Sequence, residues 1–445
     1  MAPAPAQTSA RVAPARAAAY AVVRRVFEHG AYADRALHAE AAHLDRRDRS
    51  LAMALAYGTV QRKATLDHVI AQLSTRPPQR LDSPVLAALR LGLLQLLLLD
   101  GIADHAAINE SVELAKRDGP GGAGFVNAVL RRGAREGPAV LAALSDETPP
   151  GAAILHSVPL WLAELWWREL GSEPARALLA QINAPAESAL RVNTLLATVG
   201  AVSGELGDGV RPAPGLPEGL VLERPFDVYS SQLWRRGAIM PQSRSSMLAG
   251  RVLAPQPGER VLDLCAAPGA KTTHLAALMG NQGTLHAVER HPGRAQALTR
   301  TLQRMDVHTA TVRVADATDT ASADGLYDRV LVDPPCSGLG TLQSRPDLRW
   351  RTSPERIAET AALQARILRV AAAHTRPGGT VVYSVCTISR QESEDVIEQF
   401  LGDHPRFAVE PLAGDGGAGT PYRHLLPHRD GSDGFFIARL RSGDG

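Results

Sequence analysis

The chain has 445 residues, of which 45% are hydrophobic and 21% charged, and its formal net charge is +2. These proportions exclude a disordered protein, the length favours two or three domains over one core, and the longest uncharged apolar run, residues 91–99, is too short to cross a membrane. Three cysteines without a secretion signal favour reduced thiols in the cytoplasm over a disulfide framework.

Residues 1–15 are rich in Ala and Pro and are expected to form a disordered tail. Over residues 16–140 apolar side chains recur at three- and four-residue spacing, which predicts an all-helical domain with a buried helix at 83–100. Residues 1–140 hold 18 Lys and Arg against 13 Asp and Glu, whereas the remainder holds 30 against 33. A basic front half on a mildly acidic remainder is compatible with an RNA-docking domain attached to a catalytic one.

A Pro- and Gly-containing segment at 147–157 is predicted to be a linker into a small intermediate domain at 150–240. That domain is expected to begin with a helical stretch that ends near residue 183. A strand at Ala189–Thr194 and a Gly- and Pro-rich loop at 204–219 should follow.

The last predicted domain comprises residues 241–445, and its pattern of apolar residues changes from residue 258 onward. Short apolar runs alternate there with helical segments, which predicts an α/β fold with a parallel, doubly wound, Rossmann-like sheet. Ligands in that architecture bind beyond the carboxyl ends of the strands. The predicted strands are Glu259–Leu264, Thr284–Glu289, Thr311–Val314, Arg329–Asp333 and Thr380–Cys386, and the predicted helices are Lys271–Met279, Pro292–Met305, Pro354–Ala373 and Gln391–Leu401.

The ends of the first three predicted strands indicate a nucleoside-containing ligand. A turn of small residues at Cys265–Lys271 lets backbone amides approach an anionic group at a helix start, and it lacks the glycine pattern of nicotinamide enzymes. Glu289 is placed to accept hydrogen bonds from ribose hydroxyls, and Asp316 is placed to meet an adenine amine. Each acid alone is most simply a solvated carboxylate. Three such signals at successive strand ends favour an adenosyl ligand.

Two thiols and a carboxylate follow the next two strands. Asp333 and Cys336 flank Pro334-Pro335, which ends the fourth strand, and Cys386 lies at the end of the fifth. A buried Cys is often only a small apolar residue. Side chains at neighbouring strand ends nevertheless converge on one crevice, so this group is a candidate catalytic site.

The motifs resemble two known families. Tyr57–Val60, Asn109–Val112 and Phe125–Arg131 are similar to the NusB-type RNA-binding helical domain. The cofactor turn, the two cysteine motifs and Asp433–Leu440 resemble the Sun family of RNA cytosine-5 methyltransferases, closest to its bacterial 16S ribosomal RNA branch. The resemblance covers nearly the whole chain.

The resemblance implies S-adenosylmethionine as the methyl donor and RNA, in particular 16S ribosomal RNA, as the partner. It implies that Cys386 is the nucleophile, that Cys336 assists product release, and that Asp333 borders both cofactor and target base. It further implies RNA contacts by Arg191 and Asn193. The implied cofactor-binding residues are Cys265, Ala266, Ala267, Pro268, Gly269, Ala270, Lys271, Glu289, Asp316 and Asp333.

The chemistry of cytosine explains why the family needs these residue types. Carbon 5 is too electron-poor to attack a methylsulfonium, but a thiolate that adds to carbon 6 makes carbon 5 nucleophilic. Cys386 must be partly ionised for this role, and Lys271 is the candidate source of positive charge. Two departures from the family pattern are Ser243 in place of Asp and Val385 in place of Thr before the nucleophile.

Three other interpretations remain open from the sequence. The substrate could be transfer RNA, because the choice of ribosomal RNA depends only on the resemblance of residues 16–140 to the NusB-type domain. Asp333-Pro334-Pro335 also resembles sites that methylate exocyclic nitrogens, although those need no thiol. A NusB-like RNA-binding or antitermination factor without catalysis is the non-enzymatic alternative. We expect a cytoplasmic monomer with neither a metal nor a membrane partner.

Overall fold

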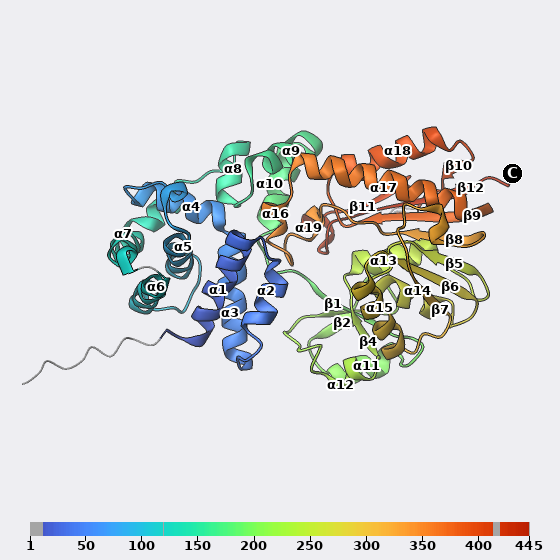
Figure 1. Cartoon of the computed structure of the whole chain (residues 1–445), viewed down its shortest axis with the longest axis horizontal. Helices are drawn as coiled ribbons and strands as arrows, with labels where there is room; N and C mark the ends of the chain where they lie inside the picture. Colours follow the sequence, from blue (N-terminus) through green and yellow to red (C-terminus); the bar gives the residue numbers. More distant parts are fainter. Residues whose placement is uncertain (1–11, 119, 413–418, 445) are drawn as a thin grey trace, which may run out of the picture. The chain divides into compact units, whose positions relative to one another are not determined.

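The computed structural model describes residues 12–118, 120–412 and 419–444 (Figure 1). The chain divides into two compact units. The helical unit contains the residues up to Asn183 together with Leu342–Arg351, and the sheet unit contains Ala184–Thr341 and Thr352–Gly445. This division differs from the predicted domain boundaries, because residues 150–183 lie in the helical unit and residues 184–240 in the sheet unit.

The helical unit is built around a buried helix, α5 (Ser83–Leu97), as the apolar stretch predicted. Gly92 allows the neighbouring helix α7 to approach closely, since a Cβ at this position would lie 2.7 Å from the side chain of Leu130. The surrounding helices are α1 (Pro14–His29), α2 (Ala33–Glu40), α3 (Arg46–Gln61), α4 (Lys63–Leu73), α6 (Asp104–Asp118), α7 (Ala123–Ala142), α8 (Pro149–Leu155), α9 (Leu160–Leu170) and α10 (Ser172–Gln181).

Two predictions for this part of the chain are wrong. The predicted tail ends too late, because α1 begins at Pro14 and Ala15 is fully buried; residues 1–11 lie outside the described residues. The predicted linker contains helix α8. Thr148 caps this helix by accepting a hydrogen bond from the Gly151 N–H, and Pro149 occupies the first turn, where its missing N–H costs nothing.

Residues 342–351 return to the helical unit from the middle of the sheet unit's sequence and include helix α16 (Leu348–Arg351). The guanidinium of Arg349 is fully buried and donates to the carbonyl of Ser157 and to Asn183 Oδ1, each at 3.0 Å. Burial lowers the pKa of Arg349 to about 9. The indole of Trp350 donates to the Val60 carbonyl at 2.7 Å. This insertion is therefore an integral part of the helical unit.

The sheet unit begins with a small antiparallel sheet in the order β2-β3-β1-β4. Its elements are β1 (Ser188–Val192), α11 (Val199–Leu206), β2 (Val210–Pro212), β3 (Gly219–Leu222), α12 (Gln232–Arg235) and β4 (Ile239–Pro241). The loop predicted at 204–219 is wrong in part, because Val210 pairs with Leu222 and forms a short edge strand. An edge strand needs pairing on one side only, so it tolerates Pro212.

The main sheet has the order β10-β12-β9-β8-β5-β6-β7, and β11 pairs with β12. β5 to β9 run parallel, whereas β12 is antiparallel to β9. This confirms the predicted Rossmann-like α/β fold behind an all-helical front. The strands are β5 (Arg260–Asp263), β6 (Thr284–Glu289), β7 (Ala310–Val314), β8 (Tyr327–Val332), β9 (Thr375–Val385), β10 (Phe407–Val409), β11 (Tyr422–Leu425) and β12 (Phe435–Ser442).

Helices cover both faces of this sheet (Figure 1). Successive residues of β9 point to opposite faces, so Val381 packs into one core cluster and Val382 into the other. The first cluster includes α17 and α18, and the second includes α13, α14 and α15. The helices of this unit are α13 (Arg244–Leu253), α14 (Ala270–Leu278), α15 (Pro292–Arg304), α17 (Pro354–His374), α18 (Glu394–Asp403) and α19 (Pro427–Asp430).

Ser243 has a clear local role in this fold. Its hydroxyl accepts a hydrogen bond from the Ser246 N–H at the start of α13, so it serves as the helix cap that an Asp would otherwise provide. Among the described residues, no helix is both long enough and apolar enough to cross a membrane.

Candidate active site

The carboxyl ends of the parallel strands define the candidate site. The strand order reverses between the neighbouring strands β5 and β8, which is where ligands bind in open α/β sheets. Cys265 lies two residues after the end of β5, and Asp333 follows β8 directly. Cys386 follows β9, the neighbour of β8 on its other side. The topology therefore brings the predicted cofactor turn and the predicted catalytic residues to one edge of the sheet.

The two thiols at this edge lie side by side. Cys336 Sγ and Cys386 Sγ are 3.3 Å apart, within hydrogen-bonding distance for sulfur, and both residues are partly buried. The hydrogen bond with Cys386, together with burial, raises the pKa of the Cys336 thiol well above its ordinary value. A protonated Cys336 is thus placed to donate its S–H to Cys386, which would stabilise negative charge on the Cys386 sulfur.

Asp333 links the thiol region to the cofactor turn. Its carboxylate accepts a hydrogen bond from Lys271 Nζ at 2.9 Å through one oxygen and from the Ser384 hydroxyl at 3.1 Å through the other. Burial alone would lower the pKa of Lys271, but Asp333, and to a smaller degree Cys386, raise it above its ordinary value. Lys271 is therefore a partly buried ammonium whose charge acts on both Asp333 and Cys386.

The predicted cofactor turn is a tight backbone turn at the start of α14. Gly269 has φ +106°, a left-handed conformation that favours glycine, and a Cβ there would lie 2.8 Å from Leu298. Arg294 donates to the Ala267 carbonyl at 2.8 Å and so fixes the turn from α15. No side chain caps α14. The first N–H groups of this helix therefore remain available to an anionic group.

Two acids flank this turn on the next strands. Glu289 ends β6, is 5% exposed, and accepts a hydrogen bond from the His291 N–H at 2.8 Å. Asp316 follows β7 and has a more exposed side chain. Hydrogen bonds from the backbone and hydroxyl of Thr318 lower the pKa of Asp316. Both acids occupy the strand ends where the sequence predicted them.

Asp263, at the end of β5, was not predicted as a site residue. Burial raises its pKa to about 7, and the Thr272 hydroxyl donates to it at 2.8 Å. The bond ties the strand to the first turn of α14. Burial also raises the pKa of the neighbouring Cys265 thiol well above its ordinary value. A thiol with a raised pKa is a poor nucleophile, so this environment argues against Cys265 as the attacking residue.

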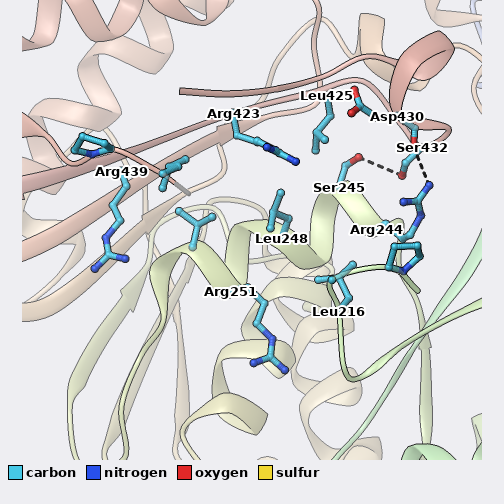
Figure 2. Close-up of a pocket in the computed structure, with 15 residues that line it drawn as sticks. Leu216, Arg244, Ser245, Leu248, Arg251, Arg423, Leu425, Asp430, Ser432 and Arg439 are labelled. Carbon is cyan, nitrogen blue, oxygen red and sulfur yellow. Dashed lines mark hydrogen bonds between the residues drawn. The ribbon is translucent and has the colours of Figure 1, made fainter. Parts of the chain in front are cut away.

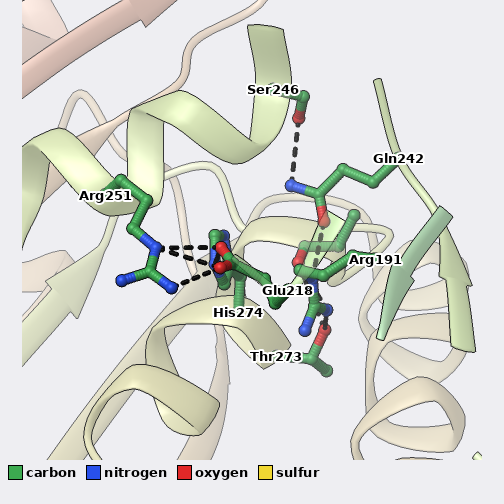
Figure 3. Close-up of polar contacts among 8 residues, drawn as sticks. Arg191, Glu218, Gln242, Ser246, Arg251, Thr273 and His274 are labelled. Atoms are coloured by element: carbon green, nitrogen blue, oxygen red, sulfur yellow. Dashed lines mark hydrogen bonds and ion pairs between the residues drawn. The ribbon is translucent and has the colours of Figure 1, made fainter. Parts of the chain in front are cut away.

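The structure places Arg191 and Asn193, the residues expected to contact RNA, in the interior, where both side chains are 0% exposed. Figure 3 shows Arg191 donating to Gln242 Oε1 at 2.8 Å and to the Thr273 hydroxyl in α14 at 2.7 Å. Asn193 donates to the Met305 carbonyl at the end of α15, at 2.9 Å. These side chains therefore fasten the small sheet to the two helices behind the cofactor turn.

A second buried link runs from the small sheet to α14. His274 Nε2 lies 2.7 Å from Glu218, which precedes β3 and also pairs with Arg251 of α13 (Figure 3). Burial lowers the pKa of His274 to about 4. The ring is therefore neutral at pH 7, and the charge of Glu218 is balanced by Arg251 instead.

Replacing Arg191 with methionine tests the structural role. We expect the free energy of unfolding to fall by about 2–4 kcal/mol, because the partners of a buried, charged donor are left unsatisfied. The matched control is Arg211→Met on β2, whose half-exposed guanidinium should contribute less than about 0.5 kcal/mol. Urea denaturation measures both. Equal, small effects would contradict the structural role and restore a surface role for Arg191.

A separate cavity of about 630 Å³ lies beside α13 (Figure 2). None of the predicted site residues lines it. Three of its arginines are neutralised by ion pairs, so it gives no argument for an anionic ligand. The pairs are Arg244 with Glu187, Arg251 with Glu218 and Arg439 with Glu410. Across the described ranges, no group of three or more potential metal ligands occurs.

The fold and site define a Rossmann-like methyltransferase with additional N-terminal domains. Family models match three successive parts of the chain: the NusB family at residues 13–135, a ferredoxin-like domain of RsmF/B-like methyltransferases at 158–229, and the 16S rRNA methyltransferase RsmB/F family at 250–441. The chain belongs to the RsmB/F methyltransferase family.

Relatives match the chain over nearly its full length. A probable ribosomal RNA small subunit methyltransferase B from Synechocystis sp. is 37% identical over 96% of this chain and 99% of its own. The ribosomal RNA small subunit methyltransferase B of Thermus thermophilus is 37% identical over 89% of each chain. Among solved structures, the crystal structure of PH0851 superposes on this chain with a TM-score of 0.81. The two sequences are 28% identical, and the match covers 97% of this chain and 100% of that one.

Proposed function

We propose that this protein transfers a methyl group from S-adenosylmethionine to carbon 5 of a cytosine in 16S ribosomal RNA, with Cys386 as covalent nucleophile. The observation that carries the proposal is the pair of thiols 3.3 Å apart at neighbouring strand ends, next to the Asp333–Lys271 ion pair. The names of the relatives, which specify the small-subunit ribosomal RNA, support the choice of substrate.

The residues around the cofactor turn fit S-adenosylmethionine. The uncapped N–H groups of α14 suit the carboxylate of its amino-acid part. Glu289 is suited to the ribose hydroxyls and Asp316 to the adenine amine. When bound there, S-adenosylmethionine supplies an electrophilic methyl group. The tight turn at Gly269 lets the protein backbone approach it closely.

The thiols supply the covalent chemistry. The Cys386 thiolate adds to carbon 6 of the cytosine, the ring double bond opens, and carbon 5 becomes nucleophilic. Once carbon 5 carries the methyl group, a base removes its proton, the electron pair restores the double bond, and the Cys386 thiolate leaves. We assign to Cys336 the assistance of this last step. The carboxyl group of Asp333, when it carries a proton, donates a hydrogen bond to the ring nitrogen, where negative charge develops.

Methylation of RNA from a strain that lacks the protein tests the proposal. Purified protein with radiolabelled S-adenosylmethionine should label 16S ribosomal RNA, and bisulfite sequencing should find one newly protected cytosine. Transfer RNA from the same strain serves as the competing substrate. Label confined to transfer RNA would overturn the substrate, and label on a base that bisulfite still converts would overturn the carbon 5 chemistry.

We further propose that the helical unit docks the RNA. Three exposed arginines, Arg46, Arg47 and Arg49, lie in the first turn of α3. Cations at a helix N-terminus oppose the helix dipole, so these residues do not stabilise α3 by their charge. An anionic partner such as an RNA backbone accounts for them better. A truncation that removes residues 1–148 would cut through the helical unit, so substitutions in the full-length chain are the sharper test.

We expect the triple change of Arg46, Arg47 and Arg49 to glutamine to weaken binding of folded 16S ribosomal RNA by about 10- to 100-fold at low salt. The slope of log affinity against log salt should fall by about 2, because each lost phosphate contact removes 0.7–0.9 of a counterion. Filter binding over a salt series measures both. The control is the same change at the exposed Arg356, Arg366 and Arg369 of α17. An unchanged slope in the α3 variant would contradict docking there.

A further inference from the structure

One buried carboxylate lies behind the two cysteines. Glu392 is 0% exposed, and both of its oxygens accept hydrogen bonds. Oε1 accepts from the Ser337 N–H at 2.8 Å, the Thr360 hydroxyl at 2.7 Å and the Gln364 amide at 3.2 Å. A backbone N–H and an amide NH₂ only donate, so Oε1 is an acceptor. No Lys or Arg among the described residues forms an ion pair with Glu392.

The second oxygen of Glu392 joins the two cysteine loops to each other. Oε2 accepts from the hydroxyl of Ser337, which follows Cys336, and from that of Thr387, which follows Cys386, at 3.1 Å. The two hydroxyls also lie 2.7 Å apart. One carboxylate therefore holds the residue after each thiol, and the spacing of the thiols depends on it.

Further hydrogen bonds connect Glu392 and its neighbour Gln364 to the segments that precede the two cysteines. The Tyr383 hydroxyl donates to the backbone carbonyl of Glu392 at 2.7 Å, and the Gln364 amide donates to the carbonyl of Pro335 at 2.9 Å. Pro335 and Tyr383 precede Cys336 and Cys386 respectively. These hydrogen bonds therefore hold the chain in place both before and after each of the two cysteines.

We propose that Glu392 is a positioning residue that fixes the two thiols at their working distance and makes them unequal, so that negative charge forms on Cys386 and not on Cys336. This assignment rests on the proposed function of the two thiols. Glu392 contacts Ser337, the residue after Cys336, through both oxygens, but it contacts Thr387, the residue after Cys386, through only one. The charge of Glu392 is one of the causes that raise the pKa of Cys336. Lys271 has the opposite effect, because its positive charge acts on Cys386 and favours the thiolate form of that residue.

Thiol alkylation by iodoacetamide tests the inequality without RNA or S-adenosylmethionine. The reagent attacks thiolates, so the rate at each cysteine against pH reports its ionisation. Mass spectrometry under single-hit conditions separates the two sites. In the unmodified protein Cys386 should react about tenfold faster than Cys336 near neutral pH. In Glu392→Gln the Cys336 profile should move down by about one pH unit, which is a tenfold rise in its rate.

Two further variants complete the test. Glu398→Gln, on the exposed face of α18, removes the same charge outside the network and should leave both profiles unchanged. Thr387→Val removes one hydroxyl contact with little change of shape; it should lower kcat about tenfold and leave both KM values within about twofold, because only alignment is lost.

An unchanged Cys336 profile in folded Glu392→Gln overturns the electrostatic part of the proposal. If Glu392→Gln does not fold, the Thr387→Val variant tests whether the hydrogen bonds of Glu392 position the thiols. An unchanged kcat in Thr387→Val overturns that positioning role. Failure of the proposed function would instead appear as turnover that survives loss of Cys386, whatever the alkylation profiles show. The two failures are therefore distinguishable.

Discussion

Replacing Cys386 with alanine is expected to abolish methyl transfer, with a fall in rate of roughly a thousandfold or more. The reason is chemical: without a thiolate at carbon 6, carbon 5 of cytosine stays too electron-poor to attack a methylsulfonium, and the pKa of the neighbouring Cys336 thiol is raised. S-adenosylmethionine binding should stay nearly intact, because Cys386 follows β9 whereas the cofactor turn follows β5. Radiolabel transfer measures the first effect, and calorimetric titration measures the second.

A sharper version of this experiment compares Cys386→Ala with Cys386→Ser. Serine keeps the size and polarity of the side chain but is hardly ionised, so both variants should be equally inactive. Turnover above a trace in either variant would remove Cys386 from the nucleophile's role. Parallel loss of S-adenosylmethionine affinity would show instead that the edge of the sheet had collapsed.

Replacing Cys336 with alanine should have a different and visible result. If Cys336 assists release, the methylated base stays attached to Cys386, and a protein–RNA adduct accumulates during turnover. The adduct should resist denaturant and appear as a shifted band on a denaturing gel. The double variant lacking both thiols should show no such band. Absence of an adduct in Cys336→Ala with S-adenosylmethionine present would assign Cys336 another role.

The fold was largely predictable from the sequence because its signals are local. Alternating apolar runs and helical segments are set by backbone periodicity, and they located β5 to β9 to within a few residues. The antiparallel strand β12 was not predicted. Its pairing with β9 joins segments that lie far apart in the chain, such as Phe436 and Val385, and no local pattern announces such a partner. Helix α8 was also missed, because its prolines were interpreted as linker residues.

The placement of candidate site residues was predictable where they lie at or shortly after the ends of strands. Cys336, Cys386, Asp333 and Glu289 all needed only the rule that parallel strands end at one edge. Glu392 was missed because the sequence predicted a helix from Gln391, which would have made it an ordinary exposed acid in a first turn. The structure instead starts α18 at Glu394, and a short 3₁₀ turn directs Glu392 inward.

Arg191 differs in the opposite way. The resemblance to the family implied an RNA contact for this residue, and the composition of the chain offers no sign that its side chain is buried. Its true surroundings depend on how the small sheet packs on α14, which is a tertiary contact between segments some 80 residues apart in sequence. Polar residues that fasten one layer of a fold to another look like binding residues until the packing is known.

The insertion of residues 342–351 into the helical unit has a consequence for how this protein can be divided. A fragment that ends at Asn183 lacks Arg349, and the oxygen atoms that this guanidinium satisfies would be left without a donor in a dry interior. A fragment that begins at Ala184 would carry Arg349 and Trp350 with their partners missing. The helical unit therefore has no independent existence as one continuous stretch of polypeptide, and any domain exchange between relatives must carry two segments of the gene together.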